Sequence, residues 1–143
     1  MTQLLENGVD VCMVQVGNET NNGMAGETQI PNIAKLMNSG SKAIREVSKN
    51  YDKDTEVALH YTNANDYDGL DSILYKLSSF QVDYDIFALS YYPYWHGTFE
   101  NLQNVMTNIQ DKYGKKTLIA ETAYCYTTED TDGSGNSVGE ADL

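Results

Sequence analysis

The sequence predicts an α/β fold, a partial (β/α)8 TIM barrel that supplies about half of the barrel with parallel strands. Four short apolar runs alternate with three helical patterns along 143 residues, and this order is typical of parallel βαβ units. Successive runs end roughly 30 to 40 residues apart, which is the length of one such unit. Each run ends in side chains that can bind or react, which favours a barrel because its active sites form where the strands end.

The four apolar runs are the predicted strands, and they are nearly continuous in apolar and β-branched residues. Such runs are typical of strands that are covered on both faces, as in parallel sheets. An open doubly wound sheet follows the same rule about strand ends, but it is usually accompanied by a phosphate loop, which this sequence lacks. The predicted strands span Val9–Val16, Glu56–Tyr61, Tyr84–Tyr92 and Lys116–Thr122.

Three helices are predicted between the strands. The first opens at Ile30–Pro31, because proline suits the first helical position, and the polar stretch Asn38–Ser41 predicts a bend or break in its middle. The second carries Leu70, Ile73, Leu74 and Leu77 on one face, with Asp68 as its candidate N-cap. The third runs from Phe99 to Tyr113 and ends before Gly114.

A complete barrel needs eight βα units and typically about 250 residues. We therefore expect residues 1–143 to form a single incomplete catalytic domain of a longer protein, with residues 127–143 as a loop tail rich in Gly and Asp. The alternative is a half-barrel that pairs with something to cover its open strand edges. Those open edges lead us to expect no activity from this piece in isolation.

The charge and composition narrow the classes of partner. A net charge of −12 argues against nucleic acid and anionic membrane, since both attract clustered Lys and Arg. The sequence has no apolar run long enough for a transmembrane helix. Acidity of this size is common in secreted enzymes that act on neutral polymers. Cys12 and Cys125 lie far apart in sequence, and we expect buried thiols rather than a disulfide.

Two glutamates at separate strand ends carry the predicted chemistry. Asn18 and Glu19 follow the first strand, and Glu121 ends the fourth. A retaining glycosidase needs one carboxylic acid to protonate the leaving oxygen and one carboxylate to attack the sugar, while a neighbouring Asn can bind the sugar 2-hydroxyl. Residue types alone also fit surface charges or loop caps, so the surrounding motifs decide the interpretation.

Those motifs are Val14–Gly23, Ser90–Thr98 and Ala120–Tyr124. They closely resemble family 53 of the glycoside hydrolases, the arabinogalactan endo-β-1,4-galactanases, and the resemblance covers essentially the whole chain, from the fourth to the seventh barrel strand of the family. It implies a secreted, retaining endo-acting enzyme that cleaves β-1,4-galactan in type I arabinogalactan and pectin side chains by double displacement. Glu19 then matches the acid/base, Asn18 the 2-hydroxyl ligand and Glu121 the nucleophile.

Further residues are candidates for substrate binding. His60 and Asn63 match the polar pair after the fifth strand of the family and are expected to position the sugar or Glu121, although His60 equally suits a histidine at the barrel rim. Either Tyr91 or Tyr92 could donate to Glu121, because one of two adjacent strand residues points outward into packing. Trp95 suits stacking on galactose, with core packing as its alternative.

The tail offers a candidate metal loop. Its oxygen-bearing side chains stand at every second position, a spacing that suits Ca²⁺ and also a solvated Asp/Gly turn. The family resemblance implies a structural calcium held between this loop and the loop after the eighth strand, and the chemistry needs no cofactor. The candidate ligands are Asp130, Asp132, Ser134 and Asn136.

Two other functions remain as alternatives. One is an inactive barrel fragment or a carbohydrate-binding remnant, which keeps Trp95 and the tyrosines but does not turn over substrate. The other is a barrel enzyme of another kind, such as an aldolase. The four strand ends carry no Lys, which argues against Schiff-base chemistry.

Overall fold

The chain forms one four-stranded sheet in which every neighbouring pair of strands is parallel. A computed structural model describes residues 1–130, 133 and 135. The strands lie in chain order, and their bounds are β1 Met13–Val16, β2 Glu56–Tyr61, β3 Ile86–Ser90 and β4 Lys116–Glu121. This arrangement matches the predicted partial barrel. The first strand begins at Met13, four residues later than the apolar run predicts.

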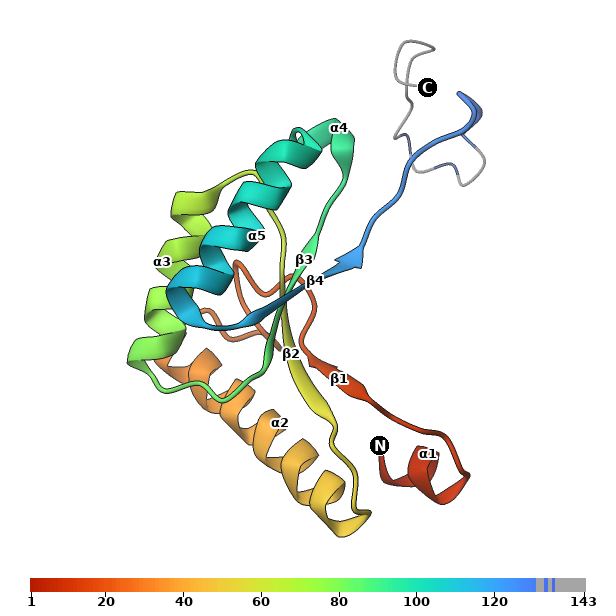
Figure 1. Cartoon of the computed structure of the whole chain (residues 1–143), viewed down its shortest axis with the longest axis vertical. Helices are drawn as coiled ribbons and strands as arrows, with labels where there is room; N and C mark the ends of the chain where they lie inside the picture. The colour runs from red at the N-terminus through yellow and green to blue at the C-terminus, as the bar shows by residue number, and fades with distance from the viewer. Residues whose placement is uncertain (131–132, 134, 136–143) are drawn as a thin grey trace.

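Three long helices cover one side of the sheet, as Figure 1 shows. They are α2 Ile30–Asn50, α3 Tyr67–Ser79 and α5 Phe99–Tyr113, and each lies in the chain between one strand and the next. Two short helices, α1 Thr2–Glu6 and α4 Pro93–His96, complete the set. The apolar stripes of the long helices pack on the sheet, and the most deeply buried side chains include Met37, Leu59, Leu74, Phe87 and Ile109.

The predicted break in the first helix is wrong, because α2 is one continuous helix of 21 residues. Gly40 lies inside it and packs directly on β1. A Cβ at Gly40 would lie 2.8 Å from Cγ1 of Val16, closer than side-chain carbons approach. The glycine therefore serves the approach of helix to strand, and the packing outweighs its low helix propensity.

The cap of α3 also differs from the prediction. Asp66 is the N-cap, and its Oδ1 accepts the Gly69 N–H at 3.0 Å. Asp68 lies in the first turn, where a negative charge interacts favourably with the helix dipole. The third long helix follows the prediction more closely: Thr98 caps its start, and Gly114 ends it at φ +63°.

An ion-pair network joins α2 to the sheet at the end where the strands begin. Arg45 Nη1 lies 2.8 Å from Asp85 Oδ2, and its Nε lies 3.1 Å from Asp83 Oδ2. Hydrogen bonds from Arg45 hold the pKa of Asp83 below its usual value. Burial raises the pKa of Asp85, but bonds from Arg45 and the Val57 N–H outweigh burial and lower it. The network fixes the scaffold opposite the reactive strand ends.

The cysteines differ from the expected buried thiols. Both are free, Cys12 is exposed, and Cys125 is half-buried. Cys12 precedes the edge strand β1, whose outer side carries no strand among the described residues, so an apolar residue there stays accessible. No helix in the described part of the chain is long and apolar enough to cross a membrane.

Candidate active site

Loops at the carboxyl ends of the strands bring the candidate residues together. Glu19 follows β1 in the left-handed backbone region, at φ +44°, and Gly17 before it has φ +89°. The next residue, Thr20, is buried and donates both its N–H and its hydroxyl to the carbonyl oxygen of His60, at 2.9 and 3.1 Å. These bonds hold the turn that carries Glu19 against the end of β2.

The two glutamates and His60 form one cluster. A carboxylate oxygen of Glu19, one of Glu121 and a ring nitrogen of His60 all lie within 4.8 Å of one another. The glutamates come from strands at opposite edges of the sheet, β1 and β4, and His60 lies between them on β2. Parallel strands bring residues about 100 positions apart in sequence to the same end of the sheet, because the carboxyl ends of all the strands lie there.

His60 is fully buried and contacts both glutamates. Its Nδ1 lies 3.1 Å from Asn18 Oδ1 and 3.7 Å from Glu121 Oε1. On the other side of the ring, Nε2 lies 2.9 Å from the hydroxyl of Ser90, and that hydroxyl donates to Glu19 Oε1 at 2.6 Å. The sequence singles out neither Ser90 nor Gln15, whose amide nitrogen lies 3.1 Å from His60 Nδ1.

The two adjacent tyrosines at the end of β3 have different roles. The hydroxyl of Tyr92 donates to Glu121 Oε2 at 3.0 Å, and this hydrogen bond raises the pKa of Tyr92, so its phenol keeps its proton. Tyr91 points the opposite way into the core and donates to the carbonyl oxygen of Gly97 at 2.7 Å. Of the two tyrosines that the sequence offers, Tyr92 is the one at the glutamate, and Tyr91 is corrected to a packing residue.

Aromatic rings extend from the glutamates toward solvent. The ring of Trp95 is 60% exposed and meets Tyr92 edge-on at a centroid distance of 5.8 Å. Tyr94 lies edge-on to Trp95 at 6.0 Å and stacks on the exposed Tyr124 at 5.1 Å. Exposed aromatic faces near a strand end suit stacking on sugar rings, and Trp95 is not packed in the core. Sequence reasoning missed Tyr94 and Tyr124.

Asn63 occupies a different hollow. It is exposed in the loop after β2 at φ +67°, and it lines a depression together with Asn21, Asn22 and Asp66. Asn21 ties this loop to the first one, since its side chain both donates to the Thr62 carbonyl and accepts the Thr62 N–H. Asn63 therefore lines this depression, whereas His60, its expected partner, lies with the two glutamates.

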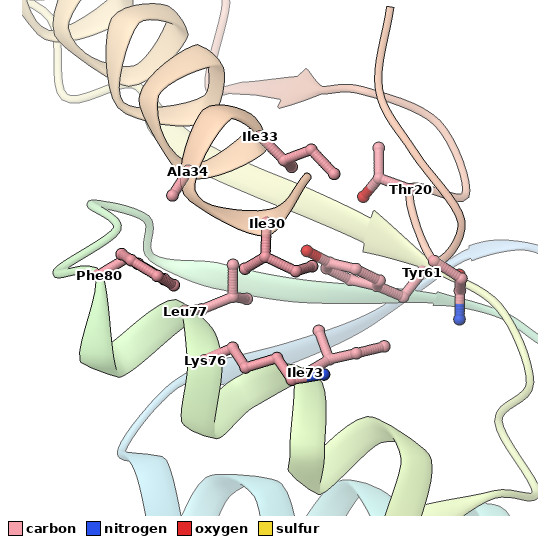
Figure 2. Close-up of a pocket in the computed structure, with 10 residues that line it drawn as sticks. Thr20, Ile30, Ile33, Ala34, Tyr61, Ile73, Lys76, Leu77 and Phe80 are labelled. Carbon is pink, nitrogen blue, oxygen red and sulfur yellow. The ribbon is translucent and has the colours of Figure 1, made fainter. Parts of the chain in front are cut away.

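An apolar crevice lies between the start of α2 and α3, behind the loop that carries Glu19. Figure 2 shows Ile30 and Ile33 on one side, Ile73 and Leu77 on the other, and the ring of Tyr61 between the two sides. Its cavity volume is about 20 Å³, which suits about one water molecule rather than a sugar. The crevice is thus a packing defect of the core and not the binding site.

Two places in the chain offer groups of the kind that bind metal ions. Glu19, His60 and Glu121 offer two carboxylates and an imidazole, but Nδ1 of His60 is already within hydrogen-bond distance of the side chains of Gln15 and Asn18. In the tail, Asp132, Ser134 and Asn136 lie outside the described residues. Asp130 accepts the N–H groups of Gly133 and Gly135 at 2.9 and 3.1 Å. The calcium site stays a prediction.

A family model decides the identity of the chain. The model for glycosyl hydrolase family 53 matches residues 1–143. The chain belongs to this family.

Family 53 relatives match nearly the whole chain. It is 48% identical over 137 residues to an endo-beta-1,4-galactanase of Bacillus subtilis, covering 96% of this chain and 31% of that protein. It is 37% identical to an arabinogalactan endo-beta-1,4-galactanase of Cellvibrio japonicus, covering 96% of this chain and 37% of the relative. The chain therefore spans about a third of the length of these relatives.

Solved structures of the family share the fold. The catalytic domain of the family 53 protein from Ignisphaera aggregans superposes with a TM-score of 0.74 at 31% identity, covering 92% of this chain and 36% of that one. A structure described as one of two fungal beta-1,4-galactanases gives the same TM-score at 21% identity, over 86% of this chain and 40% of that one. Both likenesses establish the partial barrel.

Proposed function

We propose that the protein hydrolyses β-1,4-galactan with retention of configuration, using Glu121 as nucleophile and Glu19 as acid/base. The observation that carries the proposal is the approach of the two carboxylates, whose nearest atoms lie within 4.8 Å. Retaining glycosidases hold their carboxyl groups about 5 to 5.5 Å apart, whereas inverting enzymes leave about 6.5 to 9.5 Å for a water molecule. The cluster matches the shorter separation.

The first half-reaction forms a covalent bond to Glu121. One carboxylate oxygen of Glu121 attacks the anomeric carbon while the glycosidic C–O bond breaks, and Glu19 gives its proton to the departing oxygen. Tyr92 donates to Oε2 of Glu121, which leaves Oε1 for the attack. The exposed amide of Asn18, beside the cluster, donates to the sugar 2-hydroxyl, a contact that strengthens as charge develops in the transition state.

The second half-reaction reverses these roles. Glu19, now ionised, takes a proton from a water molecule, the water oxygen attacks the anomeric carbon, and the carboxylate of Glu121 departs. Tyr92 stabilises the negative charge that returns to Glu121 at this stage. The product therefore keeps the β configuration of the substrate.

The substrate class follows from the relatives and from the aromatic rings. Relatives of 48% and 37% identity are named for activity on β-1,4-galactan. Trp95 and Tyr124 are exposed and present aromatic faces that suit the apolar faces of galactose units, and Tyr94 packs against both of them. The proposal includes galactan in arabinogalactan or pectin side chains as the substrate, a secreted full-length protein, and a structural Ca²⁺ at the tail loop.

The test uses the protein expressed from its whole reading frame. We expect release of galacto-oligosaccharides from β-1,4-galactan, with the β-anomer appearing first in the proton NMR spectrum. In Glu121→Ala the rate should fall by at least about a hundredfold. Initial release of the α-anomer contradicts the retaining mechanism, and a smaller loss removes Glu121 as the nucleophile.

The second candidate is a carbohydrate-binding remnant that does not turn over substrate. One observation favours it, the exposure of the aromatic side chains of Trp95 and Tyr124. Residues 1–143 alone would then bind galactan in a gel-retardation assay without releasing oligosaccharides. The full-length protein would show the same behaviour under this candidate, whereas the proposed enzyme releases sugars.

A further inference from the structure

We propose that Ser90 is a positioning residue for Glu19, and that its hydrogen bond to Oε1 holds the carboxyl group in place for acid catalysis. The inference rests on the proposed function of Glu19. Ser90 is the last residue of β3, it is fully buried, and its hydroxyl lies between His60 Nε2 at 2.9 Å and Glu19 Oε1 at 2.6 Å.

His60 supports Ser90 from the other side and is itself held by several polar contacts at Nδ1. The backbone N–H of Glu19 lies 3.4 Å from Nδ1, and the Gln15 amide nitrogen lies 3.1 Å from it. Asn18 Oδ1 also lies 3.1 Å from Nδ1. These contacts hold the buried imidazole ring in one orientation.

On the other side of the ring, Nε2 lies 2.9 Å from the Ser90 oxygen. The Ser90 hydroxyl donates to Glu19 Oε1 at 2.6 Å. The Ser90 hydroxyl is thus held between a buried ring and the carboxyl group, and it holds that carboxyl group in place for proton transfer to the leaving group.

This arrangement ties acid catalysis to β2 and β3 as well as to the loop of Glu19. Glu19 lies in a left-handed turn after β1 and not in the strand itself, so the sheet does not fix its backbone. Ser90 and His60 are both fully buried strand residues, and a functional group is held most precisely when its supports lie on rigid elements. Ser90 thus supplies the fixed contact that the loop lacks.

The test compares leaving groups in the protein expressed from its whole reading frame. Aryl β-galactobiosides with phenols of rising pKa need increasing help from the acid, while a dinitrophenyl leaving group needs almost none. The measured quantity is kcat/KM, which reports bond cleavage and not hydrolysis of the intermediate. For Ser90→Ala we expect kcat/KM to fall about a hundredfold with unsubstituted phenol but by less than about threefold with dinitrophenol.

Two further variants make the test specific. Ser48→Ala removes another buried hydroxyl with two hydrogen bonds, far from the glutamates in α2, and it should lower stability without changing the dependence on leaving group. Ser90→Cys keeps the volume but donates weakly, so its leaving-group slope should lie between those of the wild type and Ser90→Ala, even if the alanine variant folds poorly.

The outcomes separate the inference from the proposed function. A loss that is equal for all leaving groups, or no loss at all, overturns the role of Ser90 while leaving an active wild type in place. A wild type that cleaves none of these galactosides refutes the proposed function, and the inference falls with it.

Discussion

Replacing Tyr92 with Phe tests how the structure supports the proposed nucleophile. The substitution removes one hydroxyl, whose hydrogen bond to Glu121 Oε2 is 3.0 Å long, and leaves the ring that meets Trp95 edge-on. The neighbouring Tyr91→Phe is a matched control, because it removes the same atom from the opposite face of the same chain segment, where it bonds to the Gly97 carbonyl.

The magnitude follows from the charge on the acceptor. A hydrogen bond to a charged group contributes about 1.5 to 3 kcal/mol, which corresponds to a rate factor of roughly 10 to 150. The bond is lost when Glu121 becomes an ester and is regained as its carboxylate departs. We therefore expect hydrolysis of the covalent intermediate to slow most, so that kcat falls about 10- to 100-fold and KM falls with it.

The assay is steady-state and rapid-quench hydrolysis of dinitrophenyl β-galactobioside. Tyr92→Phe should show a burst of phenol equal to the enzyme concentration, because the intermediate accumulates. Tyr91→Phe should cost about 1 kcal/mol of folding free energy and leave kcat within about twofold. If the two variants have equal kcat, or if Tyr92→Phe raises KM with kcat unchanged, the assignment of Tyr92 to Glu121 is refuted.

Three further predictions concern the scaffold. Arg45→Met should lower the free energy of unfolding by roughly 1 to 3 kcal/mol in urea titrations. Asp83 and Asp85 have lowered pKa values, so their stabilisation is present above about pH 4 and is lost as pH falls through their folded pKa values, and Arg45→Met should flatten that acid limb. Gly40→Ala should destabilise by about 1 to 3 kcal/mol, since its Cβ would meet Val16. Chelation of calcium should lower the unfolding temperature, and adding Ca²⁺ back should restore it.

Each of these predictions has a contrary result. An acid limb that is unchanged in Arg45→Met shows that the two aspartates are not stabilised by the arginine. A Gly40→Ala variant as stable as Ser39→Ala, its exposed neighbour, shows that α2 can shift away from β1. An unfolding temperature that is indifferent to chelator removes the calcium from the tail loop.

Sequence patterns predict the sheet and the end of it that carries the reactive residues, but not which side chains there face the glutamates. Apolar runs and their spacing predict parallel strands, and parallel strands put Glu19 and Glu121 at the same end of the sheet by topology alone. They do not say which of Tyr91 and Tyr92 faces the glutamates, because adjacent strand residues alternate and the register sets the face. Burial of Tyr91 in the core resolves this.

The sequence does not identify Ser90 as a site residue, because a serine within Phe87–Tyr91 is equally typical of an ordinary small residue in a buried strand. A signal was present: Ser90 stands two positions before Tyr92 and so shares its face of the sheet. Gly40 misled in the other direction. The stretch Asn38–Ser41, which contains this glycine, predicts a bend or break in the helix. Only the close packing of Gly40 on Val16 explains why a glycine stands inside a continuous helix.

The central claim is that Glu121 forms a covalent bond to the sugar. Incubating the full-length protein with a 2-deoxy-2-fluoro β-galactobioside that has a dinitrophenyl leaving group should trap the intermediate, because the fluorine slows its hydrolysis. Mass spectrometry of the digested protein should then find one glycosyl unit on the peptide that contains Glu121. A label on another residue, or an active enzyme that is never labelled, contradicts the account.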